Sequence, residues 1–201
     1  MNAPHSPSLL AGVQMAARDP ILGLTEAFNA DKNPKKVNLG VGVYTGDDGK
    51  VPLLECVRRA ERQLVEQPAA RNYLPIDGLA AYDKVVQGLV FGADSPALKE
   101  GRIVTVQSLG GTGGLRVGAD LLHRIAPDAT LWISDPSWEN HRAVFESAGF
   151  NVNAYPYYDA NARGIDFKGM LGALKAVPAG DIVLLHACCH GRRNRYDLRR
   201  R

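Results

Sequence analysis

A glycine-rich stretch in the middle of the chain most constrains its fold. Between Leu109 and Leu115 the order is Gly110-Gly111-Thr112-Gly113-Gly114. The preceding segment, 103–106, is rich in β-branched residues and predicts a buried strand. Beyond the glycines, apolar residues recur at three- and four-residue spacing and predict a helix with one apolar face: Leu115, Ala119, Leu122 and Ile125. The glycines therefore occupy a strand-to-helix corner.

Such a corner has the physical properties of an anion site. The first turn of a helix presents unpaired backbone N–H groups and the positive end of the helix dipole, and glycine lets a phosphate approach closely. Thr112 adds a hydroxyl donor. No Lys-Ser or Lys-Thr pair follows Gly114 and the G-x-G-x-x-G spacing is missing, which excludes a P-loop and the dinucleotide fingerprint. Two interpretations stay open, a compact cradle for one phosphate or only a tight corner.

Short apolar runs alternate with amphipathic segments along the rest of the chain. Periodicity and capping residues predict helices over residues 19–33, 53–64, 79–89, 141–148 and 167–174. Apolar and β-branched runs predict strands over residues 130–134, 152–158 and 181–190. An extended apolar segment is expected over residues 37–44 and a turn at 47–50. This alternation predicts an α/β domain with a largely parallel sheet.

Three candidate site residues lie in or beside loops. Trp138 follows the strand over 130–134 at the carboxyl edge of the sheet, where ligands bind, and either stacks on a flat ring or caps the core. Tyr73 lies in the loop 72–78 and is either a packing anchor or a site residue. Gly42, with Gly40, marks either a bulge or the close approach of a ligand.

Composition and charge exclude several classes of protein. The 201 residues are 45% hydrophobic and 22% charged, as in an ordinary globular protein. No signal peptide or membrane-length apolar run is present, so we expect a cytoplasmic location. The three cysteines give neither a disulfide framework nor zinc spacing, and we expect buried, reduced thiols and no metal.

The basic character of the chain is confined to its last eleven residues. Six arginines and one aspartate give residues 191–201 a charge of +5, so the first 190 residues carry −2 of the net +3. An arginine-rich tail attracts nucleic-acid phosphates, but an acidic body offers no continuous basic face. Nucleic-acid binding is therefore the weakest of the candidate functions.

Five motifs in consistent order and spacing resemble those of class I aminotransferases, within the aspartate and aromatic amino-acid branch. They lie at residues 38–44, 72–78, 108–113, 134–141 and 186–190. The resemblance implies a fold-type-I enzyme with a three-layer α/β large domain and a mostly parallel sheet, here incomplete. It also implies pyridoxal 5'-phosphate (PLP) as cofactor and a homodimer with shared sites.

The resemblance divides the chain into four parts and assigns its site residues. The parts are an N-terminal arm (1–18), a small-domain segment (19–50), a partial PLP-binding large domain (51–190) and the tail (191–201). In the implied site, Gly110, Gly111 and Thr112 hold the phosphate, and Trp138 stacks on the pyridine ring. Tyr73 reaches the partner subunit's cofactor, and Gly42 lies with Trp138 against the substrate. His141 and His186 support the acid at the ring nitrogen.

The implied reaction transfers an amino group from aspartate or an aromatic amino acid to 2-oxoglutarate. The family continues after His190 with Asn-Pro-Thr-Gly, whereas this chain continues with Gly191-Arg192-Arg193-Asn194. The Schiff-base lysine, the ring-nitrogen acid and the carboxylate-binding arginine of the family have no counterpart in the chain. We therefore expect a truncated and inactive chain, and the abrupt change at residue 191 suggests a shifted reading frame. A non-catalytic phosphate-binding or interaction fragment is the alternative.

Overall fold

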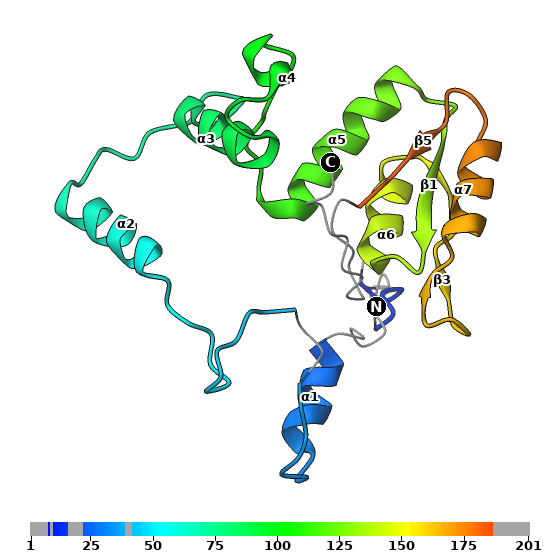
Figure 1. The fold of residues 1–201 in the computed structure, drawn as a ribbon, viewed down its shortest axis with the longest axis horizontal. Helices are drawn as coiled ribbons and strands as arrows, with labels where there is room; N and C mark the ends of the chain where they lie inside the picture. Colours follow the sequence, from blue (N-terminus) through cyan, green and yellow to red (C-terminus); the bar gives the residue numbers. More distant parts are fainter. Residues whose placement is uncertain (1–7, 9, 16–21, 39–41, 187–201) are drawn as a thin grey trace, which may run out of the picture. The chain divides into compact units, whose positions relative to one another are not determined.

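The computed structural model describes residues 8, 10–15, 22–38 and 42–186, and the chain forms two compact units, residues 1–71 and 72–201 (Figure 1). The predicted tail, Gly40 and the adjacent Cys188 and Cys189 lie outside the described residues. No helix in the described part of the chain is long and apolar enough to cross a membrane.

The first unit contains two helices, α1 (Leu22–Ala30) and α2 (Glu55–Glu66), where the sequence predicts them. The predicted turn is also present, because the Gly46 N–H donates to the Lys50 carbonyl oxygen at 2.8 Å. Gly49 lies at φ 72°, a backbone conformation that favours glycine. Residues 42–44 form no strand, and Tyr44 is exposed.

The apolar side of α2 is not buried in this structure. Its apolar residues, and those just before it, are largely exposed: Leu53, Leu54, Val57 and Leu64. The helix forms because its sequence has helical periodicity, but burial needs a second layer. The described residues supply no such layer over this face.

In the described part of the second unit, residues 72–186, the chain forms the sheet and five helices. The helices are α3 (Ala80–Phe91), α4 (Pro96–Lys99), α5 (Gly110–Ile125), α6 (Glu139–Ser147) and α7 (Phe167–Ala176). The strands are β1 (Thr130–Asp135), β2 (Asn151–Pro156), β5 (Ile182–Val183) and the two-residue hairpin strands β3 (Tyr158–Asp159) and β4 (Gly164–Ile165). The predicted α/β alternation is confirmed.

The three-stranded sheet is parallel, in the order β2-β1-β5. Helices α5 and α6 lie on one side of the sheet and α7 on the other, so this unit has three layers (Figure 1). The chain moves from β1 to the neighbouring β2, and then returns past β1 to β5. This reversal of direction makes the carboxyl edge between β1 and β5 the place where an α/β sheet opens a crevice.

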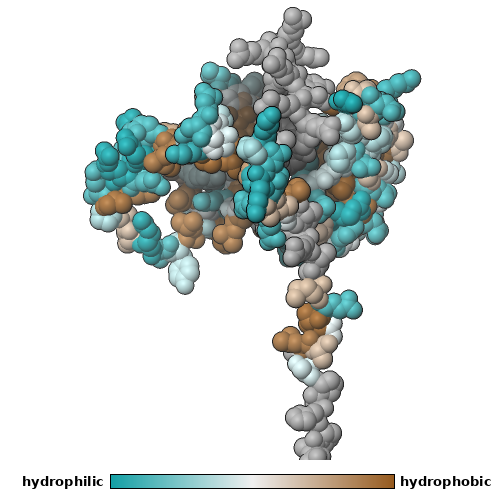
Figure 2. All heavy atoms as spheres, turned by 90° about the horizontal axis from the view of Figure 1, so that it is seen from below, coloured by the Kyte–Doolittle hydropathy of each residue, from teal (hydrophilic) through white to brown (hydrophobic). Residues whose placement is uncertain are grey.

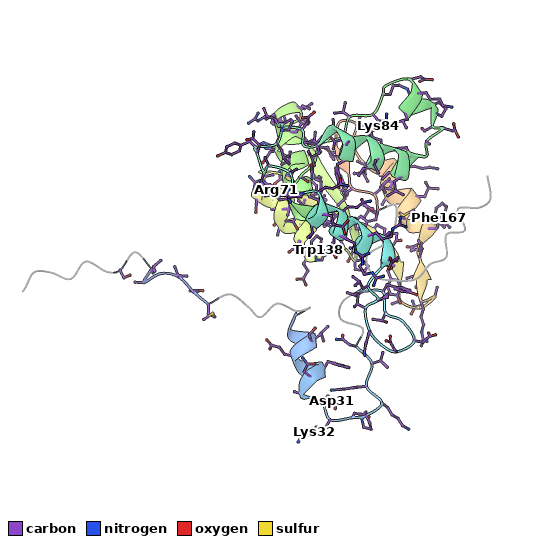
Figure 3. The ribbon with its side chains drawn as sticks, turned by 90° about the vertical axis from the view of Figure 1, so that its left-hand side faces the viewer. Asp31, Lys32, Arg71, Lys84, Trp138 and Phe167 are labelled. Carbon is purple, nitrogen blue, oxygen red and sulfur yellow. The ribbon has the colours of Figure 1, made fainter. Side chains whose placement is uncertain are left out.

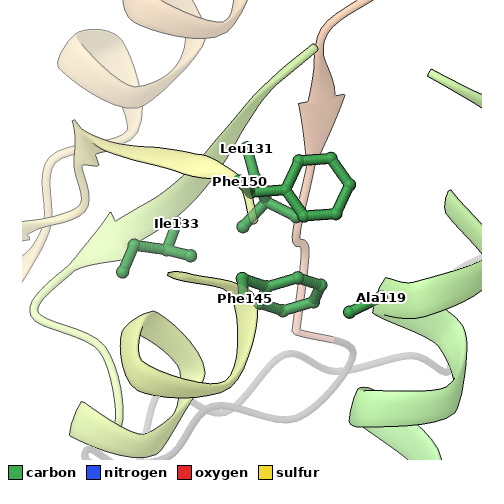
Figure 4. Close-up of a cluster of buried hydrophobic side chains, with 5 residues drawn as sticks. All are labelled: Ala119, Leu131, Ile133, Phe145 and Phe150. Carbon is green, nitrogen blue, oxygen red and sulfur yellow. The ribbon is translucent and has the colours of Figure 1, made fainter. Parts of the chain in front are cut away.

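The core of the second unit is small and lies between the sheet and helices α5 and α6. Figure 4 shows its five buried side chains, which are Ala119, Leu131, Ile133, Phe145 and Phe150. Leu131 and Ile133 alternate along β1 and therefore share one face. Two residues of the predicted apolar face of α5, Leu115 and Leu122, pack against this cluster.

Two predicted strands differ from the structure. Residues 103–106 are extended and alternate between partly buried and exposed, but no described strand pairs with them. Propensity alone cannot make a strand, because the ladder needs a neighbour. The strand predicted over 181–190 is confirmed only at Ile182–Val183, and residues 181–184 are partly rather than fully buried.

Candidate functional site

Three aromatic rings meet at the carboxyl edge of the sheet. Trp138 is the residue before α6 and is partly buried, and Figure 3 labels it at this position. His141, 5% exposed, lies in the first turn of the same helix. The centroids of the two rings are 5.2 Å apart and their planes are nearly perpendicular, at 89°. The indole is therefore held by an edge-to-face contact with the imidazole.

His186 joins this cluster from the segment after β5. Its ring centroid lies 4.7 Å from that of His141, with an interplanar angle of 62°. Because β1 and β5 are adjacent and parallel, the segments that follow them emerge at the same edge. The sheet thus brings together two histidines that are far apart in the sequence.

Ser137 fixes the other side of the His141 ring. Its Oγ lies 3.0 Å from His141 Nδ1, at hydrogen-bond distance. Ser137 and His141 are four residues apart around the start of α6, a spacing at which side chains can meet. The sequence prediction did not include Ser137 among the site residues, although this i, i+4 spacing could have indicated it.

The start of α5 has the geometry expected of a phosphate cradle. Leu109 precedes the helix without any capping side-chain hydrogen bond, and the first turn contains no acidic residue. Gly110 has φ 65°, so a residue with a Cβ would be strained there. Gly110, Gly111 and Thr112 are all exposed. The Gly110 N–H donates to the Ser108 carbonyl oxygen at 3.0 Å, so the N–H groups of Gly111 and Thr112 are the donors that this 16-residue helix can offer to an anion.

The glycines that follow let the chain fold tightly over this turn. A Cβ on Gly114 would lie 3.0 Å from Ser108 Oγ, and one on Gly113 would lie 3.3 Å from Leu109 Cβ. A Cβ on Gly111, in contrast, would meet nothing within 4 Å. The structure thus separates glycines needed for backbone packing from one that borders open space.

The helix start and the ring cluster belong to the same edge of the sheet. Helix α5 leads into β1 and α6 follows it, so each helix runs antiparallel to β1 and begins at its carboxyl end. Figure 1 shows β1 pointing toward the end of the unit at which α5 begins. Two helix N-termini at one edge give that edge a positive electrostatic character.

Two other predicted site residues, Tyr73 and Gly42, lie in other segments of the chain. Tyr73 is 99% exposed, in the loop before α3. Gly42 belongs to the first unit, and a Cβ there would meet nothing within 4 Å. All eight lysines are described, and each is exposed except the partly buried Lys36, whose Nζ donates to the carbonyl oxygens of Phe28 and Asp31. The described residues contain no cluster of three or more potential metal ligands.

Comparisons with known proteins point to one family. Residues 34–191 match the sequence pattern described as aminotransferase class I and II. The chain is 60% identical over 183 residues to an aspartate aminotransferase of Pseudomonas aeruginosa, covering 91% of this chain and 46% of that protein. It is 50% identical to an aromatic-amino-acid aminotransferase of Escherichia coli, covering 89% of this chain and 45% of that protein.

A solved structure gives the same result for the fold. The aromatic-amino-acid aminotransferase of Burkholderia pseudomallei, described as covalently bound to pyridoxal phosphate, superposes with a TM-score of 0.85 at 62% identity. The match covers 92% of this chain and 46% of that one. The chain therefore spans about half the length of the relatives it matches.

Proposed function

Because the chain belongs to the class I and II aminotransferase family, we propose that it supplies the phosphate cradle and the ring-stacking surface of a PLP-dependent aspartate or aromatic amino-acid aminotransferase. The observation that carries this proposal is the uncapped, glycine-lined start of α5 at the same sheet edge as Trp138, His141 and His186. PLP, when bound, withdraws electrons from the amino acid's Cα, so that its proton can leave.

The residues of this chain fit the chemistry of that cofactor. A phosphate dianion suits backbone N–H donors at a helix start, and Thr112 adds a hydroxyl donor there. The Trp138 ring is held by a near-perpendicular contact with the His141 ring, and an indole is a suitable surface for stacking on a flat pyridine ring. His141 and His186, whose rings contact each other, would support the groups that pair with the pyridine ring.

Binding measurements with three small molecules test the proposal. We expect the chain to bind PLP and, more weakly, inorganic phosphate, as measured by equilibrium dialysis. Gly111→Asp places a carboxylate in open space at the helix start and should weaken PLP binding by about tenfold or more through repulsion. The matched control is Gly118→Asp, farther along the same helix, where a Cβ also meets nothing within 4 Å.

The stacking part of the proposal has its own variants. Trp138→Leu should weaken binding of both PLP and pyridoxal, which lacks the phosphate, while Gly111→Asp should affect only the phosphate-bearing ligands. Phe167→Leu, an exposed aromatic residue on α7, is the control for loss of a ring. Equal PLP affinity in wild type, Gly111→Asp and Trp138→Leu would contradict the assigned site.

We further propose that this chain does not transaminate by itself. Amino transfer to 2-oxoglutarate needs a lysine at the cofactor, and seven of the eight lysines here are exposed while the eighth is tied to α1. Glutamate formation from aspartate or tyrosine with added PLP and 2-oxoglutarate should stay at the background level. Turnover above that level would overturn this part of the proposal and leave the binding site unaffected.

The exposed Tyr73 supports a dimer with shared sites. In such a dimer its hydroxyl would reach the phosphate bound by the partner. Tyr73→Phe should then weaken PLP binding only at protein concentrations at which light scattering detects a dimer. We also propose a cytoplasmic location, since a relative from Oryza sativa that is 52% identical over 186 residues is named a cytoplasmic aspartate aminotransferase.

A further inference from the structure

Tyr155 links two strands of the sheet that are not neighbours. It lies in β2, is 2% exposed, and its hydroxyl donates to the carbonyl oxygen of Leu184 at 2.9 Å. Leu184 directly follows β5, whereas β1 separates β2 from β5 in the sheet. The phenol therefore spans β1, joining the two outer strands.

The bond lies where the β1–β5 ladder ends. The last paired residues are Trp132 and Val183, followed by one further bond from the Leu184 N–H to the Trp132 carbonyl oxygen at 2.9 Å. On the other side of β1, pairing with β2 continues to Asp135 and Pro156. The chain after Leu184 thus leaves the sheet while β1 continues.

His186 is only two residues beyond this point. Two peptide units leave little slack, so the place where Leu184 is held largely determines where the His186 ring can lie. That ring lies 4.7 Å from His141, which in turn supports Trp138. The Tyr155 hydroxyl is thus connected to the ring cluster by a short and direct path.

We propose that Tyr155 is a positioning residue, whose hydroxyl sets where the chain leaves β5 and thereby places His186 against His141. Its ring fills the interior like any buried aromatic side chain, but the hydroxyl adds a directional bond to one carbonyl. The position of His186 follows from the structure alone. Its consequence for PLP binding depends on the proposed function.

A second contact anchors β5 at its other end and gives a structural control. The Asp181 carboxylate accepts from the Thr130 N–H at 3.0 Å and from Trp132 Nε1 at 2.9 Å. These bonds lie before β5 and five residues from His186. Loss of the Asp181 bonds should lower the stability of the sheet, whereas loss of the Tyr155 bond should move the imidazole of His186.

The experiment records imidazole signals of the full chain by ¹H–¹⁵N correlation NMR. Tyr155→Phe keeps the ring and removes only the donor. We expect it to shift the signals of His186 and His141 and to weaken PLP binding by about three- to tenfold. Tyr82→Phe, at a half-exposed tyrosine on α3, should change neither.

Asp181→Asn separates positioning from general loosening. It should lower the urea midpoint while leaving the two imidazole signals unchanged. Unchanged imidazole signals in Tyr155→Phe would overturn the proposal, as would equal shifts in Asp181→Asn. If wild type binds no PLP, the proposed function fails, but the imidazole signals still decide the role of Tyr155. If Tyr155→Phe does not fold, the hydroxyl holds the whole sheet and the positioning role is refuted.

Discussion

The Asp181 carboxylate links two strands of a narrow sheet through two hydrogen bonds. It accepts one backbone and one indole N–H from β1, and so ties the two-residue strand β5 to its neighbour. Hydrogen bonds to a charged group are worth more than neutral ones. At the residue scale, this contact therefore compensates for a short backbone ladder.

The first prediction follows from this contact. Asp181→Asn keeps the shape of the side chain but removes its charge. One carboxylate oxygen becomes an NH₂ group, so a donor then faces the N–H of Thr130 or of the Trp132 indole. We expect the free energy of unfolding to fall by about 1.5–3 kcal/mol. Urea denaturation followed by far-UV circular dichroism measures the change. Asp128→Asn, at an exposed position, is the control and should have little effect; equal losses in both variants would contradict the assigned role.

Removing the Asp83 carboxylate is expected to have the opposite effect and to raise the free energy of unfolding. It lies on α3 at 7% exposure, and its Oδ1 is buried without a hydrogen-bond partner among the described residues. Burial of a polar atom without a partner costs free energy. Asp83→Ala should therefore raise the free energy of unfolding by about 1 kcal/mol, with helix propensity contributing in the same direction. A lower urea midpoint in this variant would show that the carboxylate stabilises the unit.

At the scale of elements, alanine substitutions at two glycines are expected to change stability in opposite directions. Gly118 lies inside α5, where a Cβ would meet nothing within 4 Å, so Gly118→Ala should stabilise the chain by about 0.5–1 kcal/mol. Gly149 follows α6 with φ 101°, and a Cβ there would lie 2.9 Å from His123 Nε2. Gly149→Ala should destabilise by more than Gly118→Ala stabilises. Thermal unfolding of both variants measures these changes in stability. A shift of the unfolding midpoint in the same direction in both variants would contradict the prediction.

The elements themselves were largely predictable from the sequence because they depend on local patterns. Helices α3, α5 and α6 follow from three- and four-residue apolar spacing, and β1 from a short β-branched and aromatic run. The strand predicted over 103–106 failed because pairing is not local. The exposure of the apolar side of α2 could not be predicted for the same reason, since a helix pattern does not specify what covers it.

The candidate site was predictable to a different degree at each residue. The glycines and Thr112 were indicated by their place between strand and helix, and Trp138 by its place after a strand. His186 was named only through the resemblance to aminotransferases. No spacing rule could relate Tyr155 to Leu184, 29 residues apart, because that contact exists only once the sheet order is known.

At the scale of the molecule, the core is small relative to the exposed apolar surface. Five buried hydrophobic residues form its centre. Many large apolar side chains are exposed on both units, and hydrophobic side chains are visible at the surface in Figure 2. The relatives are about twice as long as this chain. Such surface promotes association.

The final prediction concerns the extended segment 103–107. Gln87 Nε2 donates to Thr105 Oγ1 at 3.0 Å, and the Leu79 N–H donates to Gln107 Oε1 at 3.0 Å, so these odd-numbered side chains face the rest of the unit. Val104 is 88% exposed on the opposite side. An extended, apolar segment without a strand partner is a template for pairing with another chain.

We therefore expect wild type to form assemblies larger than a dimer as its concentration rises. Val104→Lys should reduce them, because a charge on an unpaired edge opposes strand pairing. Val65→Lys, at a valine on α2 that is 80% exposed, adds the same charge away from the segment and should have a smaller effect. Light scattering coupled to size exclusion measures both variants. Equal reduction in both would mean that net charge controls association, and a wild type that never exceeds a dimer would mean that this edge is not a pairing surface.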